Sequence, residues 1–71
     1  FSILNYIYEQ NQTNNFVYQK NICNHFSISK VTTQKRISSL IDKGLISFRK
    51  KGRTKNLFIT ERGIQLLRKR A

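Results

Sequence analysis

The stretch SKVTTQKRISSLIDKGLISFRKK, residues 29–51, changes its apolar spacing part-way along, and this change indicates the fold. Between residues 30 and 43 the spacing is helical. The inward face of this helix is formed by Thr33, Ile37, Leu40 and Ile41. Ser29 is a favourable N-cap, and Gly44 suits the position just past a helix C-terminus. Ile46 and Phe48 then alternate with polar residues, so the stretch predicts a capped helix followed by a β-strand.

A second alternating run follows a basic turn. Leu57 and Ile59 lie two residues apart, which predicts a second strand that pairs with the first as a β-hairpin. Five Lys and Arg side chains fall within residues 49–55, around the glycine of the turn. A disordered basic tract or a short localisation signal would not show alternation on both sides. The charge is therefore expected at the tip of a folded hairpin.

Two helices are expected before this stretch. Residues 1–10 and 16–26 have apolar side chains at helical spacing, and residues 11–15 between them have the composition of a loop. Asn15 is one candidate cap for the second helix. In the alternative, residues 16 and 17 form a short strand before that helix begins.

A last helix is expected after the hairpin. Thr60 can cap it, the negative charge of Glu61 suits its N-terminal end, and Ile64 and Leu67 are expected to face inward. Helix, helix, turn, helix, hairpin and helix is the order of a winged helix-turn-helix. This fold is α+β and mainly α, with a three-helix core, a two-stranded wing and a C-terminal helix. Residues 1–71 are expected to be a single domain of a longer protein, since the chain does not begin with methionine.

The balance of charge favours a polyanionic partner. The chain has 14 Lys and Arg residues against three acidic residues, and its formal net charge is +11. Such an excess on one small domain is typical of nucleic-acid binding, and it predicts double-stranded DNA as the partner. A basic patch for an acidic protein or a lipid surface would give the same count.

The sequence offers little evidence for a membrane protein, a metal-binding protein or an enzyme. No apolar run approaches the length of a membrane span, so a cytoplasmic protein is expected, nucleoid-associated if it is prokaryotic. Cys23 and His25 point in different directions on a helix, and no second Cys or His completes a metal site. We expect His25 to lie at the surface. With three scattered carboxylates, we predict no catalytic, metal or cofactor site and no enzymatic activity.

Residues 29–51, followed by LFITERGIQLL at residues 57–67, resemble the winged-helix core of the MarR-type transcriptional regulators. The matching positions are Ser29, Thr32, Lys35, Ile37, Leu40, Gly44, Leu45, Ile46, Ile59, Thr60 and Gly63. The resemblance implies a repressor that binds specific DNA sites as a homodimer through its first and last helices. It also implies that Cys23, which stands where family members carry a small alanine, packs against the third helix. A replication, plasmid-partition or mobile-element protein of modest specificity is an alternative, because such proteins share the pattern. A winged helix that binds other proteins is a further alternative.

In this fold the N-terminal half of the third helix enters the major groove. Its candidate DNA contacts are Lys30, Val31, Thr32, Gln34, Lys35 and Ser38. Gln34 can pair with adenine and Lys35 can donate to guanine. Val31 or Thr32 can pack on a thymine methyl group. An ordinary solvated polar face is the alternative.

The basic hairpin is expected to contact phosphates. Its candidates are Arg49, Lys50, Lys51, Arg53 and Lys55. Arg53 is the candidate for the minor groove, although Lys51 stands where MarR-type wings often carry an acidic residue. Near the start of the second helix, Tyr18, Gln19 and Lys20 are candidates for additional backbone contacts. A charged, solubilising turn is the alternative for the hairpin.

Overall fold

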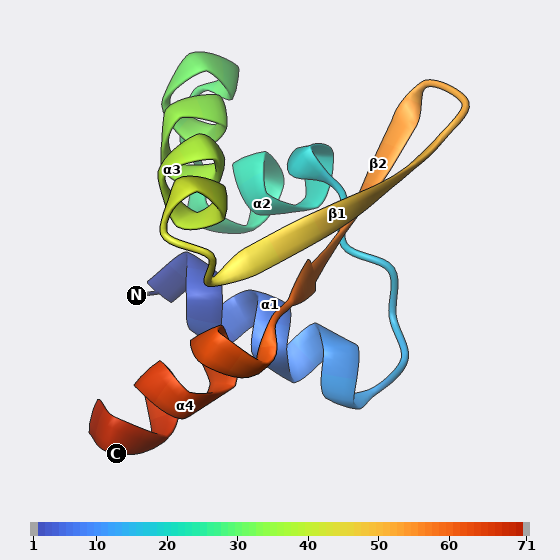
Figure 1. Ribbon diagram of the computed structural model, residues 1–71. Helices are drawn as coiled ribbons and strands as arrows, with labels where there is room; N and C mark the ends of the chain where they lie inside the picture. Colours follow the sequence, from blue (N-terminus) through green and yellow to red (C-terminus); the bar gives the residue numbers. More distant parts are fainter. Residues whose placement is uncertain (1, 71) are drawn as a thin grey trace.

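The chain folds into three helices, a β-hairpin and a further helix, in the order that the sequence predicts (Figure 1). The structure is a computed structural model and describes residues 2–70. Its elements are α1 (Ser2–Gln12), α2 (Gln19–Phe26), α3 (Lys30–Asp42), β1 (Ile46–Lys51), β2 (Thr54–Ile59) and α4 (Glu61–Arg70). This order confirms the predicted winged helix-turn-helix.

Residues with left-handed backbone end the first three helices. α1 runs to Gln12, two residues further than predicted, because Asn14 adopts a φ of 59° and closes its last turn. Ser27, with a φ of 53°, ends α2. Gly44, with a φ of 73°, ends α3 at the predicted position. Each of these residues lies within two positions of the last residue of its helix, where the chain leaves the helical conformation.

The segment before α2 is extended because it lies beside β2. The carbonyl oxygen of Val17 accepts a hydrogen bond from the Leu57 N–H group at 2.7 Å, and its N–H group donates to Asn56 Oδ1 at 3.1 Å. Tyr18 is the N-cap residue of α2, so the prediction that Asn15 caps this helix is wrong. The alternative, a short strand at residues 16 and 17, is closer to the observed conformation.

α3 begins as predicted and is held to α2 by a chain of hydrogen bonds. The Ser29 hydroxyl accepts from the Thr32 N–H group at 3.1 Å, which confirms the N-cap. Thr33 is fully buried, and its hydroxyl donates to the Ser29 carbonyl oxygen at 2.8 Å. The Cys23 thiol donates to Thr33 Oγ1 at 3.1 Å, so Cys23 packs against α3 as expected. His25 lies at the surface, also as expected.

The wing is formed by β1 and β2, which pair antiparallel through a two-residue turn. Lys51 lies opposite Thr54, which leaves Gly52 and Arg53 as the turn. Gly52 has a φ of 62°, as a tight hairpin turn with glycine in the first central position requires. The turn lies at the far end of the hairpin, away from the helices (Figure 1).

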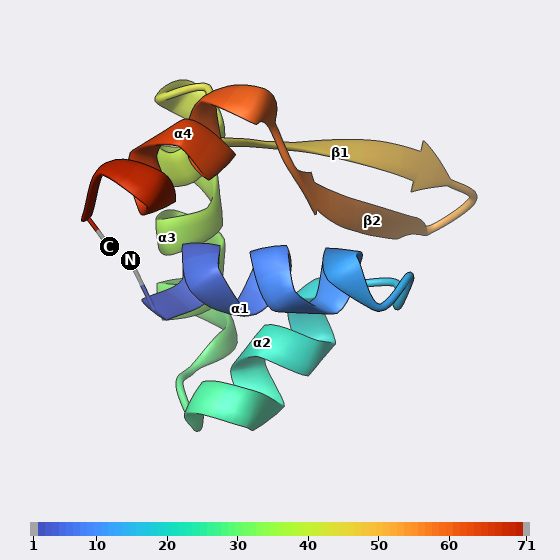
Figure 2. The same cartoon turned by 90° about the horizontal axis from the view of Figure 1, so that it is seen from below.

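The core lies between the helices and the base of the wing. The largest fully buried side chains are Leu4, Ile7, Ile22, Ile46, Val17 and Thr33. α1 crosses the body between α2 and α4 (Figure 2). Because Ile3, Leu4 and Ile7 are all buried within this chain, α1 keeps little apolar surface for a second subunit.

α4 docks against the base of the wing at Gly63. A Cβ atom at Gly63 would collide with the carbonyl oxygen of Leu45, so only glycine permits this approach. Leu66 and Leu67 are half-buried and pack against the core. Leu67 therefore faces inward as predicted. Ile64 is also half-buried.

Candidate nucleic-acid interface

The outer face of α3 is exposed along its N-terminal half. Five of the six predicted contacts on this helix are exposed, namely Lys30, Val31, Gln34, Lys35 and Ser38. Val31 has 61 % of its surface exposed, so its methyl groups are accessible on this face. Thr32 is half-buried, and its hydroxyl accepts a hydrogen bond from the Ser29 hydroxyl at 2.9 Å. The Thr32 hydroxyl is therefore engaged in the helix cap.

The wing presents basic side chains on both of its faces. Its five predicted contacts, Arg49, Lys50, Lys51, Arg53 and Lys55, are all exposed. Side chains alternate along a strand, so Lys50 and Lys55 share one face with Phe48, and this face looks toward α3. Arg49 and Lys51 lie on the opposite face. The basic residues of the wing therefore divide into a group near α3 and a group that points away from it.

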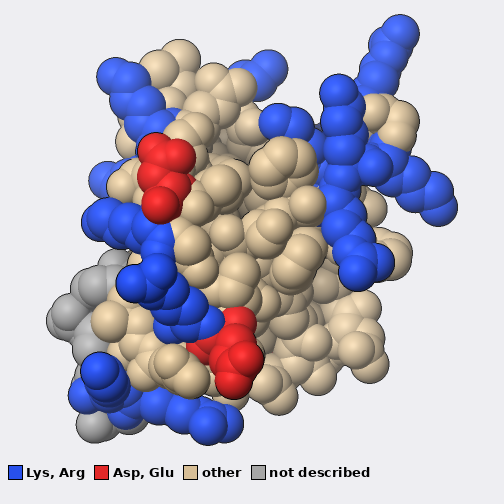
Figure 3. Space-filling model, in the orientation of Figure 1, with Lys and Arg blue, Asp and Glu red and all other residues tan. Residues whose placement is uncertain are grey.

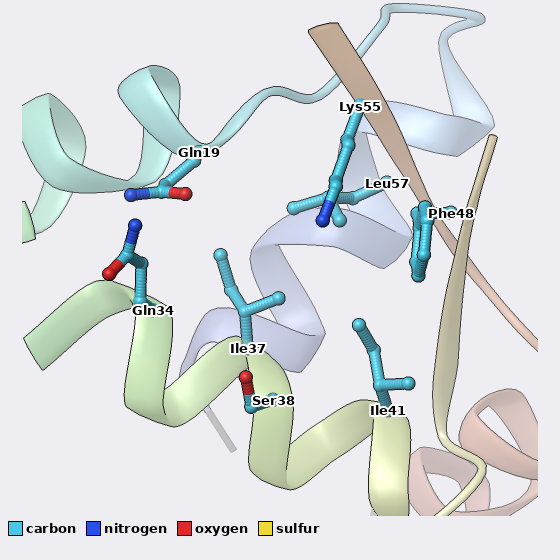
Figure 4. A pocket seen from close by; sticks show the side chains of 8 residues that line it. All are labelled: Gln19, Gln34, Ile37, Ser38, Ile41, Phe48, Lys55 and Leu57. Carbon is cyan, nitrogen blue, oxygen red and sulfur yellow. The ribbon is translucent and has the colours of Figure 1, made fainter. Parts of the chain in front are cut away.

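A hollow of about 270 Å³ lies between α3 and the wing (Figure 4). It is lined by Gln19, Gln34, Ile37, Ser38, Ile41, Phe48, Lys55 and Leu57. Figure 4 shows Ile37 and Ile41 pointing into it from α3, and the Lys55 ammonium pointing into it from the wing. The amide groups of Gln19 and Gln34 face each other at one end. Predicted contacts from the third helix and from the wing therefore meet in one space.

A second hollow, of about 380 Å³, adjoins the first. It is lined by Tyr18, Gln19, Lys20, Lys30, Gln34, Arg53, Thr54 and Lys55. Gln19, Gln34 and Lys55 border both hollows, which therefore form one concave surface. We call this surface, with the residues that line the two hollows, the α3–wing groove. It brings together eight contacts that the sequence predicted separately on α2, on α3 and on the wing, namely Tyr18, Gln19, Lys20, Lys30, Gln34, Ser38, Arg53 and Lys55. The other predicted contacts do not line it, namely Val31, Thr32, Lys35, Arg49, Lys50 and Lys51.

The α3–wing groove is electropositive. None of the described residues that line it is acidic, whereas Lys20, Lys30, Arg53 and Lys55 all border it. Figure 3 shows Lys and Arg side chains gathered around the wing, and the acidic side chains visible on this face lie apart from the wing. Lys50 also lies directly opposite Lys55 in the hairpin, and like charges in this position repel each other. A polyanion in the groove would relieve this repulsion.

Two exposed residues of the groove, Phe48 and Thr54, are absent from the contacts that the sequence predicted. Phe48 belongs to an alternating run that predicts a buried face, yet 38 % of its surface is exposed. It lines the hollow between α3 and the wing, where the space above the helix leaves part of its ring accessible. Thr54 lies next to the turn, and its hydroxyl donates to the Lys51 carbonyl oxygen at 2.9 Å. The exposure of Phe48 and Thr54 depends on how the wing lies relative to α3, and a local sequence pattern does not indicate this.

Among residues 2–70, no three His, Cys, Asp or Glu side chains are grouped so that they could hold a metal ion. In the same part of the chain, none of the helices is long and apolar enough to cross a membrane.

One known family matches the chain. The family model of the F-93 winged-helix domain covers residues 2–63. The chain belongs to this family. The F-93 match extends from the start of α1 to the first turn of α4, so it includes α3, the wing and all residues of the α3–wing groove. An F-93 winged-helix domain indicates helix-turn-helix DNA binding in general, and the match does not show membership of the MarR-type regulators. No curated protein and no solved structure matches the chain significantly.

Proposed function

We propose that this chain is a sequence-specific double-stranded DNA-binding domain of a transcriptional repressor. The observation that carries the proposal is the α3–wing groove, in which polar side chains of α3 and basic side chains of the wing border one concave, acid-free surface. A DNA duplex exposes base edges in its grooves and phosphates along the edges of the grooves. A protein that recognises a sequence therefore needs base contacts and phosphate contacts at a fixed spacing. The groove and the exposed face of α3 offer both.

In the proposed complex, the N-terminal half of α3 enters the major groove and the wing lies on the backbone or in the adjacent minor groove. Gln34 and Lys35 are exposed on the outer face of α3, where they can reach base edges. Lys20 and Arg53 border the groove on either side and supply phosphate contacts. Arg53 occupies the turn, the outermost point of the wing, which suits the narrow minor groove of A·T-rich DNA.

The regulatory role rests on the resemblance of residues 29–51 and 57–67 to MarR-type regulators. We propose that the protein acts in the cytoplasm, by occupying a promoter, and without enzymatic activity of its own. Its three carboxylates, Glu9, Asp42 and Glu61, belong to three different helices, which supports a binding role.

We further propose a homodimer in which α4 contributes most of the interface. The apolar side chains of α4, namely Ile64, Leu66 and Leu67, are only half-buried, whereas Ile3, Leu4 and Ile7 of α1 are buried within the chain. A two-fold dimer predicts inverted half-sites about 10 base pairs apart, one turn of the duplex.

The test is selection of duplexes from a random library, followed by measurement of affinity for the selected and the random duplex at several salt concentrations. We expect the selected duplex to bind more tightly at every salt concentration. We also expect log K to fall with log salt by about 0.9 per phosphate neutralised. Equal affinity for both duplexes would instead favour a replication, plasmid-partition or mobile-element protein. Failure to bind either duplex would favour a protein-interaction module.

A further inference from the structure

Lys55 is directed toward the base of the wing rather than toward its tip. Its ammonium nitrogen lies 4.8 Å from the centre of the Phe48 ring. Phe48 is the diagonal neighbour of Lys55 on the same face of the hairpin, because Phe48 pairs with Leu57 and Lys50 pairs with Lys55. The attraction of a cation for the face of an aromatic ring and repulsion from Lys50 both favour this direction.

This direction places the Lys55 ammonium beside α3. Lys55 and Gln34 border both hollows of the α3–wing groove, and the ammonium points into the space above Ile37 (Figure 4). Phe48 lines the same space, with more than a third of its surface exposed. The ring covers one side of the ammonium and leaves its remaining N–H donors free for an anion.

We propose that Phe48 is a positioning residue of the DNA interface, which holds the Lys55 ammonium in the α3–wing groove for a phosphate next to the bases that α3 contacts. The inference rests on the proposed duplex binding. It assigns to Lys55 a phosphate contact near α3 that the other lysines of the wing do not make. A lysine side chain has many rotamers, and restricting them before binding reduces the entropy that is lost in the complex. Among residues 2–70 no aromatic ring holds Lys50 in this way, so Lys50 serves as a matched comparison. It is the same residue type, directly opposite Lys55 on the same face.

The test is a double-mutant cycle on the affinity for the selected duplex. Phe48→Leu keeps an apolar side chain at the site, and we expect it to weaken binding about two- to fivefold, the contribution of one exposed cation–aromatic contact. Lys55→Ala is expected to lower the salt dependence by about 0.9, the equivalent of one phosphate. In the Lys55→Ala background, Phe48→Leu should have no further effect. In a Lys50→Ala background it should keep its full effect, and Phe48→Tyr should bind like the wild type.

A measurement on the free protein makes the test independent of DNA. Protons held over an aromatic ring resonate upfield, so the ε-methylene protons of Lys55 should be shifted in the NMR spectrum of the wild type and not in that of Phe48→Leu. An unshifted Lys55 in the wild type would overturn the inference. So would an equal loss of affinity from Phe48→Leu with and without Lys55. If the wild type binds no duplex at all, both the proposed function and this inference are wrong. If a duplex binds but the effects of Phe48→Leu and Lys55→Ala are simply additive, only this inference is wrong.

Discussion

The Thr60 hydroxyl donates a hydrogen bond of 2.6 Å to the carbonyl oxygen of Gly44, and so joins the start of α4 to the end of α3. The same hydroxyl accepts from the Gly63 N–H group at 3.2 Å, and the Thr60 N–H group donates to the Leu45 carbonyl oxygen at 3.1 Å. The wing leaves the body just after Gly44 and returns just before Thr60. These bonds therefore close the base of the wing and set its direction relative to α3.

Replacing Thr60 by valine should destabilise the protein. Valine keeps the shape of the side chain but can neither donate to Gly44 nor accept from Gly63, so we expect unfolding free energy to fall by about 1–2 kcal/mol. Thr60→Ser should retain most of the stability. The measurement is urea denaturation followed by circular dichroism. Thr54→Val is the control, since the Thr54 hydroxyl is bonded in an exposed turn, and an equal loss there would contradict the role assigned to Thr60.

Gly63→Ala should cost more stability than Gly52→Ala. A Cβ atom at Gly63 would collide with the backbone of Leu45, so α4 must move away from the wing, at a cost of about 2–3 kcal/mol. At Gly52 nothing lies within 4 Å of the added atom, and the cost is the left-handed backbone alone, about 1 kcal/mol. Thermal denaturation of both variants ranks the two effects. A larger loss of stability in Gly52→Ala than in Gly63→Ala would show that α4 can shift freely.

Gln34→Ala and Lys35→Ala should reduce discrimination between duplexes. If each side chain contacts a base edge, its loss removes about 1–3 kcal/mol of preference for one base pair and has less effect on random DNA. The measurement compares the affinity for the selected duplex with affinities for duplexes altered at single positions. Lys43→Ala, at the far end of α3, is the control for lost charge. Unchanged discrimination in both variants would remove α3 from base reading.

Arg53→Ala should weaken binding to most duplexes to a similar extent. The arginine lies at the turn of the wing, so its loss is expected to reduce the salt dependence by about 1. The loss should be larger where A·T-rich flanks narrow the minor groove. Arg68→Ala on α4 removes the same charge away from the α3–wing groove and should have little effect. If the two variants behaved alike, the wing tip would lie outside the interface.

Lys50→Thr should stabilise the free protein at low salt. It removes the repulsion from the directly opposite Lys55, which is expected to raise unfolding free energy by about 0.5 kcal/mol. The gain should fade at high salt, where the repulsion is screened. Lys51→Thr is the matched control. It gives the same gain in strand propensity, but Lys51 lies opposite the uncharged Thr54, so no directly opposed like charge is removed. An equal gain in both variants would mean that charge repulsion in the wing is negligible.

Local signals explain why much of the fold could be predicted. Ser29 and Gly44 mark the two ends of α3 through bonds and backbone angles within a few residues, and both were predicted. The alternation of Ile46 and Phe48 predicted the wing for the same reason. The start of α2 could not be predicted, because Val17 is held beside β2 by an asparagine 39 positions further along the chain. An asparagine in the sequence does not indicate which backbone group it will bind.

By itself, the sequence determined the order of the elements, the excess of positive charge and the residue types available for DNA contact. Only the tertiary structure decided which of these residues share a surface. Asn11 accepts a hydrogen bond from the Ile59 N–H group, 48 positions away, and Thr60 bonds to Gly44 across the base of the wing. Contacts of this kind set the direction of the wing, and that direction brings Lys55 and Gln34 to the same hollow. The physical reason is that periodicity and capping act between near neighbours, whereas the groove depends on how distant segments pack.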